Sequence, residues 1–561
     1  MLNQNRFSKI IKYVFLVLGF MFLLVCWSAF YWKYERFVNE LLNILKINKY
    51  ENQIKKVFTS QKFDVFKYIF VFLGVLFLIL STKSLYISKN IKLIIILSIG
   101  LLKFKIRQTN RFYFLALAAM PMFLAFYFAV VLPIHCDEAW THLYFSTRGI
   151  VSSIAYYPST NNHIFYSLLT NFTLKIPWFS DLFLLRLPSI FAAFGSLFVC
   201  YHFIKNFFNN TFANLFLAIY PLLFLNIYYS ILARGYSFLM LFFVLSLYAL
   251  MKTSQDNRRF FWVIYVLSSS LGFYTMPSFL YPFVSLNVFY LLVYFKNIRQ
   301  QIVYNLMTVA LVLMLYTPVL LVSGIDSLIN NPVLIPTKQS RAKSIANLIP
   351  FTQKCLSELV QIPHFSFIFL ILVLISPLLM QKNNKKWLIL CLIALLMPAV
   401  FMVANSMRHY TRVFLYYNLF IGILMVLPVY TLFKSLKIKP NLPILIAVQL
   451  LFIPIFCLQI KTYHHEWYAY QTLSQKIIKT DAKTFYSVAR AFQPPFIFYL
   501  KEHKNMRDFK TKYNFKAIDL DTLQAHYDCI VLEKNMDKTH SKKPNFTAEN
   551  LNIYYFKGNL P

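Results

Sequence analysis

The sequence predicts an all-α polytopic membrane protein that ends in a small soluble α/β domain. Of its 561 residues, 58% are hydrophobic and only 14% are charged, and the mean hydropathy is +0.56. Apolar runs of roughly 17–25 residues, the length that crosses a hydrocarbon core, recur along most of the chain. From Lys461 onward these runs stop and the density of charged residues rises. The alternating segments of an outer-membrane barrel are absent.

About thirteen apolar runs are candidates for transmembrane helices. The first is followed by a mixed-charge stretch and not by a small-residue cleavage site, so we expect an anchor and not a removed signal peptide. The expected spans are residues 13–31, 66–82, 112–132, 183–204, 211–229, 236–252, 260–276, 279–295, 303–322, 365–380, 387–404, 412–433 and 443–460.

The distribution of basic residues predicts the orientation. Residues 1–105 form an N-terminal two-span extension, and residues 106–460 form the transmembrane core. Lysines and arginines concentrate in alternate loops of the core, and the positive-inside rule places these loops and the N-terminus in the cytoplasm. The short apolar segment 91–102 is expected to be interfacial or re-entrant, because the later basic loops would face the wrong side if it spanned. We expect a multi-pass protein of the inner (plasma) membrane.

Two long outer loops, residues 133–182 and 323–364, follow from this topology. The first contains two stretches, 139–148 and 164–174, whose mixed apolar and polar residues are typical of helices lying along a membrane surface. Residues 461–561 predict an extracytoplasmic α/β domain of about 100 residues. Its expected strands are 484–488, 529–532 and 552–556, and its expected helices are 467–479 and 495–503.

The net charge of +36 does not require a nucleic-acid partner, because membrane topology explains most of the basic residues. Some of those outside could instead serve an anionic lipid phosphate. The seven cysteines are scattered without CxxC spacing and are interpreted as small core residues. We expect neither a disulfide framework nor a metal site built from them.

An acidic pair is the first candidate for chemistry. Only six acidic residues lie between positions 112 and 460, and two of them, Asp137 and Glu138, are adjacent just after an apolar run. A carboxylate so near hydrocarbon is costly unless it faces water or a partner. It could accept a proton from an acceptor hydroxyl or amine. Alternatively, Asp137 caps the following helix and Glu138 favours its N-terminal end. Metal ligation by the flanking histidines is less favoured.

A polar cluster follows in the same loop. Asn161, Asn162 and His163 stand directly before the second surface helix, a few residues after Tyr157. Helix capping by asparagine is one interpretation. The other places Tyr157, Asn162 and His163 in an outer pocket, where they would contact the acceptor.

Three arginines lie at the outer ends of spans. Arg186, Arg234 and Arg412 could each extend to the interface as isolated residues. A guanidinium is also suited to bind phosphate through its planar fork of donors. Together with the acidic pair, the arginines predict a pocket that holds a base and an anion site.

The motifs resemble those of the GT-C superfamily of integral-membrane glycosyltransferases. The matching residues are Asp-Glu-Ala at 137–139, Asn-Asn-His at 161–163, Arg-Leu-Pro-Ser at 186–189 and Ala-Arg-Gly-Tyr at 233–236. They are similar to the protein O-mannosyltransferase and aminoarabinose-transferase branch, particularly its uncharacterised bacterial members. The resemblance covers residues 110–330 best and hardly extends to the first 105 residues or the tail.

The resemblance implies transfer of a sugar from a polyprenyl-phosphate donor to an acceptor lipid, glycan or protein on the outer face of the membrane. Asp137 would be the general base, with Glu138 supporting it or binding the acceptor. Arg234 and Arg412, with Arg186, would bind the donor phosphate, and His163 would be a contact residue in the pocket. Such a reaction inverts the anomeric centre. Many relatives carry an acidic residue that 229–237 lacks, so no cofactor is expected, although a divalent cation stays possible.

Two other functions are compatible with the sequence. A lipid or glycan transporter (flippase) would place charged groups near the midplane and show repeats or broken helices. An O-antigen polymerase or ligase would use diphosphate donors. The clustering of acids at the outer boundary favours the glycosyltransferase over both.

Overall fold

The computed structural model describes most of the chain. The described residues are 4–45, 51, 54–55, 58–82, 84, 108–255, 259–329, 340–362, 364–380, 385–405, 410–479, 484–487, 493–501, 508–511, 528–533, 544, 546–548 and 551–555. The segment 91–102, expected to be interfacial, lies outside them.

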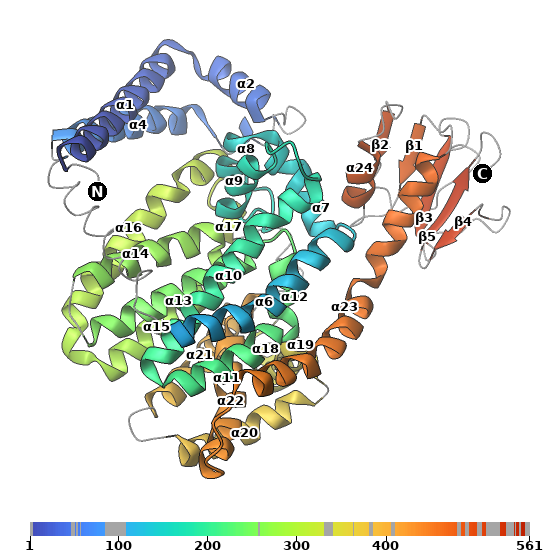
Figure 1. Ribbon diagram of the computed structural model, residues 1–561. Coiled ribbons are helices and arrows are strands. Elements are labelled where there is room, and N and C mark those ends of the chain that lie inside the picture. Colours follow the sequence, from blue (N-terminus) through green and yellow to red (C-terminus); the bar gives the residue numbers. More distant parts are fainter. Residues whose placement is uncertain are drawn as a thin grey trace.

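A bundle of long apolar helices forms the body of the molecule (Figure 1). Seven described helices are long and apolar enough to cross a membrane, or up to nine if each of two bent pairs is one span. The seven include α6 (Gln108–Val131), α10 (Asp181–Phe207), α13 (Tyr236–Thr253), α16 (Ile298–Val322), α21 (Lys386–Asn405), α22 (Tyr417–Ser435) and α23 (Leu442–Ile478). The protein is therefore a multi-pass membrane protein, and the expected count of about thirteen spans stays a prediction.

The two bent pairs interrupt the regular bundle. The expected span 211–229 consists of α11 (Asn210–Ile219), η3 (Tyr220–Leu222) and α12 (Phe224–Ile231), and the chain bends by 63° at the break. Pro221 lies in the 3₁₀ turn and cannot donate a backbone hydrogen bond. The second pair, α19 (Leu348–Val360) and α20 (Phe365–Leu379), is bent by 96°. Shorter helices α14 (Arg259–Thr275) and α15 (Leu280–Val293) complete this part.

The N-terminal region forms a helical hairpin. Helices α1 (Gln4–Tyr31) and α4 (Ser60–Thr82) pack closely, and a Cβ on Gly74 would lie 2.7 Å from Leu23. The connecting helix α2 (Tyr34–Leu45) is amphipathic and shares an apolar cluster with Phe145 and Tyr156 of the loop between α6 and α10. The hairpin therefore rests against that loop.

The loop between α6 and α10 is largely helical. Helix α7 (Cys136–Tyr144) with η2 (Ser146–Arg148), and α9 (Ile164–Thr173), lie where two surface helices were expected. A short helix between them, α8 (Ile150–Ala155), was not expected. In the second outer loop lie α17 (Asp326–Ile329), α18 (Arg341–Ala346) and α19.

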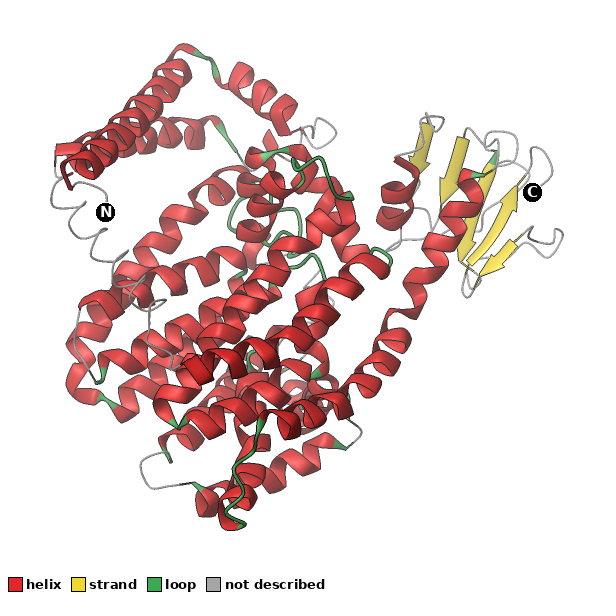
Figure 2. Ribbon diagram, in the orientation of Figure 1, coloured by secondary structure: helices red, strands yellow, loops and turns green. Residues whose placement is uncertain are grey.

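The C-terminal region contains a five-stranded sheet of order β2-β1-β3-β5-β4 (Figure 2). Strand β1 (Thr484–Ser487) pairs in parallel with β2 (Asp508–Thr511) and β3 (Cys529–Glu533), whereas β5 (Leu551–Tyr555) pairs antiparallel with β3 and β4 (Phe546–Ala548). Helix α24 (Gln493–Lys501) also matches an expected element. Helix α23 joins the expected span 443–460 to the expected helix 467–479 and ends at Ile478, and the domain boundary at 460/461 stays a prediction.

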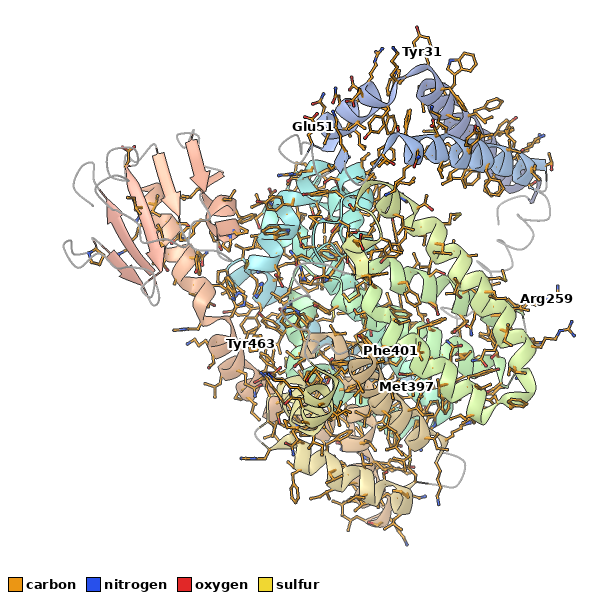
Figure 3. The ribbon with its side chains drawn as sticks, turned by 180° about the vertical axis from the view of Figure 1, so that it is seen from behind. Tyr31, Glu51, Arg259, Met397, Phe401 and Tyr463 are labelled. Atoms are coloured by element: carbon orange, nitrogen blue, oxygen red, sulfur yellow. The ribbon has the colours of Figure 1, made fainter. Side chains whose placement is uncertain are left out.

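The helix order places the basic loops together. Successive helices run up and down, so Lys252, Arg259 and Lys434 all lie at helix ends opposite to α7, α8 and α9. Figure 3 shows Arg259 projecting from the edge of the molecule, far from Glu51 in the connection after α2.

Candidate functional site

His135, and not Asp137, caps the N-terminus of α7. The His135 Nδ1 accepts a hydrogen bond from the Asp137 N–H at 3.0 Å, and the Glu138 carboxylate accepts one from the His135 N–H at 2.8 Å. This reciprocal arrangement is a capping box. The alternative in which Asp137 caps the helix is therefore wrong, and its side chain, 27% exposed, is free to face other groups.

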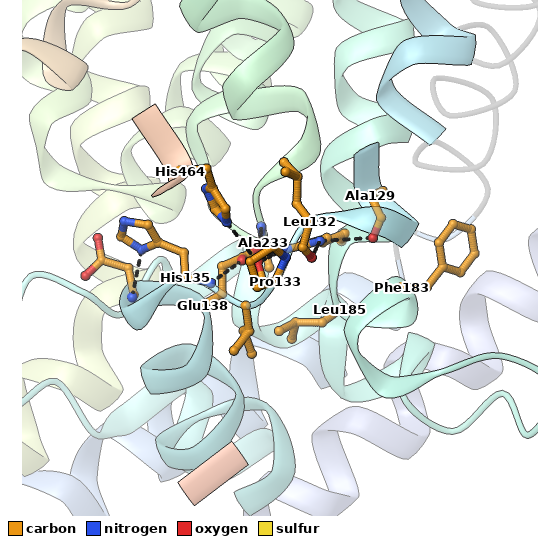
Figure 4. A network of polar contacts seen from close by, with 12 residues as sticks. Ala129, Leu132, Pro133, His135, Glu138, Phe183, Leu185, Ala233 and His464 are labelled. Atoms are coloured by element: carbon orange, nitrogen blue, oxygen red, sulfur yellow. Dashed lines mark hydrogen bonds and ion pairs between the residues drawn. The ribbon is translucent and has the colours of Figure 1, made fainter. Parts of the chain in front are cut away.

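Glu138 and Arg186 form a fully buried ion pair (Figure 4). The Arg186 Nε and Nη2 donate to the two carboxylate oxygens at 2.9 and 2.7 Å. Its other N–H groups donate to the carbonyls of Ala129, Leu132 and Pro133, so the guanidinium satisfies the C-terminal end of α6. The Glu138 carboxylate also accepts the Ala233 N–H at 2.6 Å.

This geometry corrects two expectations. Every N–H of the Arg186 guanidinium has a protein partner, so it is not placed to bind a donor phosphate. Glu138 has no exposed surface, so it is not placed to bind an acceptor. The pair instead joins α6, α7, α10 and the turn that carries Arg234.

Arg234 and Arg412, which we call the arginine pair, flank Asp137. Their guanidinium nitrogens lie 3.6 and 3.5 Å from the same oxygen, Asp137 Oδ2. Burial opposes ionisation of this carboxyl, but the two guanidinium groups outweigh it and hold its pKa well below the usual range. The three groups together carry one positive charge, which favours a further anion.

Arg234 is held from the 157–163 segment. Its Nη1 donates to the backbone and side-chain oxygens of Asn161, and the Asn161 amide donates to the Asp137 carbonyl at 3.2 Å. The Nε of Arg234 is buried and has no hydrogen-bond partner within the described part of the chain. An unsatisfied buried donor of this kind is costly unless a ligand or water meets it.

His163 faces Arg234 with a defined ring orientation. Its Nδ1 accepts the Gly235 N–H at 2.7 Å, so the neutral ring carries its proton on Nε2, 3.3 Å from Arg234 Nη2. Burial, and then the charge of Arg234, hold the His163 pKa well below its ordinary value, so the ring is neutral. Two donors therefore converge where an anion would satisfy both. A Cβ on Gly235 would lie 2.7 Å from Thr275 and 2.9 Å from His163, so this approach requires glycine.

Asn162 and Tyr157 support the loop. The Asn162 side chain is fully buried and donates to the carbonyls of Ser153 and Tyr156, which makes it a structural residue and not a pocket contact. Tyr157 is 1% exposed, and its backbone N–H donates to Ser323 at 2.8 Å. Asn161 is the asparagine that reaches Asp137 and Arg234.

Tyrosines line the same site. The Tyr229 and Tyr236 rings lie 4.4 Å apart, and Tyr236 also packs edge-on against His163 at 5.2 Å. The Arg412 guanidinium lies over the Tyr410 ring at 4.6 Å. Such rings offer amphipathic surfaces to a ligand that is polar at its edges.

Two C-terminal elements brace the start of α7. The His464 Nε2 on α23 donates to the Pro133 carbonyl at 2.9 Å, and the Tyr228 hydroxyl donates to His464 Nδ1 at 3.2 Å. On α24, the Tyr499 hydroxyl accepts the Ile134 N–H at 2.9 Å. The backbone just before Asp137 is therefore fixed by contacts from α23 and α24.

Within the described residues, no group of three or more His, Cys, Asp or Glu side chains is arranged to hold a metal ion.

Comparison with solved structures shows which fold this is. ArnT from Cupriavidus metallidurans in the apo state superposes with a TM-score of 0.52 at 11% identity, over 78% of this chain and 96% of ArnT. The chain has the fold of ArnT. The same protein bound to undecaprenyl phosphate gives a TM-score of 0.53, also at 11% identity, over 79% of this chain and 98% of ArnT. The resemblance that the sequence motifs predict is thus confirmed at the level of the fold, which is that of ArnT. No family profile matches the chain, and no curated protein matches its sequence.

Proposed function

We propose that the protein is a membrane glycosyltransferase that takes a sugar from a polyprenyl-phosphate donor. The observation that carries the proposal is the position of Asp137 between the two cations of the arginine pair. A carboxylate next to two guanidinium groups supports the proposal, because sugar transfer from a phosphate uses a base beside an anion site. That an ArnT structure binds undecaprenyl phosphate on the same fold supports the lipid class of the donor.

In the proposed reaction, the arginine pair and the His163 Nε2–H hold the donor phosphate. The acceptor hydroxyl or amine attacks the anomeric carbon from the opposite face, the bond from that carbon to the phosphate oxygen breaks, and Asp137 takes the proton. Polyprenyl phosphate leaves with the bonding electrons, and its charge is stabilised by the same guanidinium groups. The product has inverted anomeric configuration.

Donor binding would also prepare the base. A carboxylate held between two guanidinium groups is a weak base, because its pKa is far below the operating pH. A phosphate that engages the arginine pair competes for the same N–H donors and brings negative charge, and both effects raise the Asp137 pKa. Asp137 is then most basic when the donor is in place.

We also propose that the site opens on the extracytoplasmic side of the inner membrane. The basic residues at the helix ends opposite to α7 support this orientation. The acceptor, a lipid, a glycan or a protein, would approach over the exposed Tyr410 and the Arg412 side. The domain boundaries at 105/106 and 460/461 remain part of this proposal.

The test compares wild-type protein with Asp137→Asn in nanodiscs that contain a polyprenyl-phosphate-linked sugar. Mass spectrometry of lipids and glycans in a deletion strain identifies the acceptor first. Asp137→Asn keeps the shape of the side chain but removes the base, so transfer should fall by about 10²–10⁴-fold. Unchanged transfer by a stably folded variant would refute the proposal, and movement of a labelled lipid without any acceptor would indicate a flippase instead.

A further inference from the structure

We infer that Glu358 and Thr411 position Arg412 for the donor phosphate. The inference rests on the proposed function. It concerns a carboxylate of the second outer loop, far in sequence from the Asp137–Glu138 pair.

The two arginines of the pair are held differently. Arg234 is 3% exposed, and its guanidinium bonds to Asn161. Arg412 is 31% exposed, and the contacts described for its side chain are Asp137 at 3.5 Å and the face of Tyr410. The direction of the Arg412 side chain therefore depends on the backbone that carries it.

That backbone is a 3₁₀ turn, η8 (Thr411–Phe414), which packs against α19. The Thr411 hydroxyl donates a hydrogen bond to Glu358 Oε2 on the last turn of α19. The rings of Phe351 and Phe414 lie 5.8 Å apart on the same interface. A hydrogen bond to a carboxylate is stronger than one between neutral groups, so it fixes the residue next to Arg412.

The end of α19 is itself anchored. Gln361 adopts a left-handed conformation, with φ of 57°, that ends the helix, and its N–H donates to the Ser357 carbonyl at 2.7 Å. The Gln459 amide on α23 donates to the Gln361 carbonyl at 2.5 Å. Glu358 is therefore a bridge between a fixed helix end and the Arg412 turn.

The chain supplies a matched control on the same carboxylate. Lys354 lies 3.4 Å from the other oxygen, Glu358 Oε1, but its side chain is 56% exposed. An exposed ion pair of this kind contributes little to the free energy of unfolding. Removing Lys354 alters the charge around Glu358 without touching the bond to Thr411.

The experiment uses the full-length protein in nanodiscs. Titration with undecaprenyl phosphate measures binding, and turnover of a polyprenyl-phosphate-linked sugar gives donor KM and kcat separately. Glu358→Ala and Thr411→Val should each weaken binding by about tenfold, because each loses a charge-assisted hydrogen bond. The loss should appear in KM, with kcat nearly unchanged. The double variant should lose no more than either single variant. Glu358→Gln keeps an acceptor oxygen and should restore most of the affinity, and Lys354→Ala should match wild type.

Arg412→Ala separates this inference from the proposed function. If Arg412→Ala weakens binding but Glu358→Ala and Thr411→Val do not, the positioning role is refuted and the arginine pair stands. If Arg412→Ala leaves binding unchanged, the phosphate site itself is refuted. Should Glu358→Ala fail to fold, the nearly isosteric Thr411→Val still decides the matter.

Discussion

At the scale of single residues, the site is organised around the Asp137 carboxylate. In the absence of a ligand, this carboxylate occupies the position between the arginines that a phosphate would also favour. In the proposed reaction, its charge competes with the donor phosphate before the carboxylate assists the acceptor. We therefore expect that removing this carboxylate lowers sugar transfer but raises donor affinity.

Asp137→Asn should bind undecaprenyl phosphate more tightly than wild type, although it transfers sugar far more slowly. Removing one negative charge about 4 Å from two guanidinium groups leaves them free for the phosphate, and we expect affinity to rise about tenfold at low salt. Titration in nanodiscs at two ionic strengths measures this. Weaker binding by the variant would show that Asp137 does not share the phosphate site.

Gly235→Ala should disrupt the anion site without changing any charge. The added methyl group would overlap Thr275 and His163, and it would displace the ring that faces Arg234. We expect donor affinity and transfer to fall by more than about tenfold. A loss of about 1.4 kcal/mol in binding free energy already lowers affinity tenfold. Gly195→Ala is the control, because its methyl group would meet only Leu241 at 3.4 Å. Equal behaviour of the two variants would contradict the packing argument.

Individual roles were less predictable from the sequence than the presence of the site. The motifs identified Asp137, His163, Arg234 and Arg412, which the structure brings together. They did not separate Asn161 from its buried neighbour Asn162, since adjacent identical residues differ only in the direction of the side chain. His135 was not recognised as a cap, because histidine is not among the preferred residues at that position.

At the scale of elements, one buried ion pair fixes the start of α7. Arg186 satisfies the end of α6, and Glu138 binds the turn before Arg234. Both side chains are inaccessible, so the pair holds the backbone that carries Asp137 and Arg234.

Glu138→Gln should destabilise the protein by about 3–5 kcal/mol, because it leaves the Arg186 charge buried and uncompensated. Thermal unfolding of the purified variant in detergent measures the loss. Asp64→Asn removes a partner of the exposed Lys67–Asp64 pair and should cost less than about 1 kcal/mol. Normal stability of Glu138→Gln would show that the pair does not hold these helices.

His135 should make stability depend on pH. Burial lowers its pKa to about 4, below the ordinary value of 6.5, so the folded protein holds it neutral while the unfolded chain takes up a proton. Its contribution is complete above about pH 6.5 and is lost as the pH falls toward 4. His135→Asn keeps an oxygen that can cap α7 but does not titrate, so its melting temperature should fall less over this interval. Parallel melting curves for the two proteins would contradict this assignment.

Regular elements could be predicted better than their interruptions. Apolar runs gave the helices of the core, and α9, β1, β3 and β5 lie where the sequence pattern placed them. The bend within 210–231 was not predicted, because hydropathy does not register a turn made of apolar residues. Strands β2 and β4 were not predicted; β4 has only three residues, which is too short for a clear alternation, and β2, Asp508–Thr511, contains one apolar residue in four.

At the scale of the whole molecule, the proposed orientation can be measured directly. Trp178, which is 82% exposed between α9 and α10, and Leu436, which is 58% exposed after α22, should face opposite sides of the membrane. With Trp178→Cys, a membrane-impermeant maleimide should label intact spheroplasts, whereas Leu436→Cys should react only after permeabilisation. The protein without either substitution is the control, because it measures the labelling of the seven native cysteines. The reverse pattern would invert the topology and place Asp137 in the cytoplasm.

Helix α23 has a mechanical consequence. Its 37 residues form one helix, with Pro454 inside it and a contour length of about 55 Å, and the C-terminal sheet lies beyond one end. His464, which donates a hydrogen bond to the Pro133 carbonyl just before α7, lies part-way along this helix. A displacement of that sheet would therefore shift α23 and, through His464, the backbone just before α7. A partner that binds the C-terminal sheet could in this way alter the proposed sugar transfer without contacting Asp137.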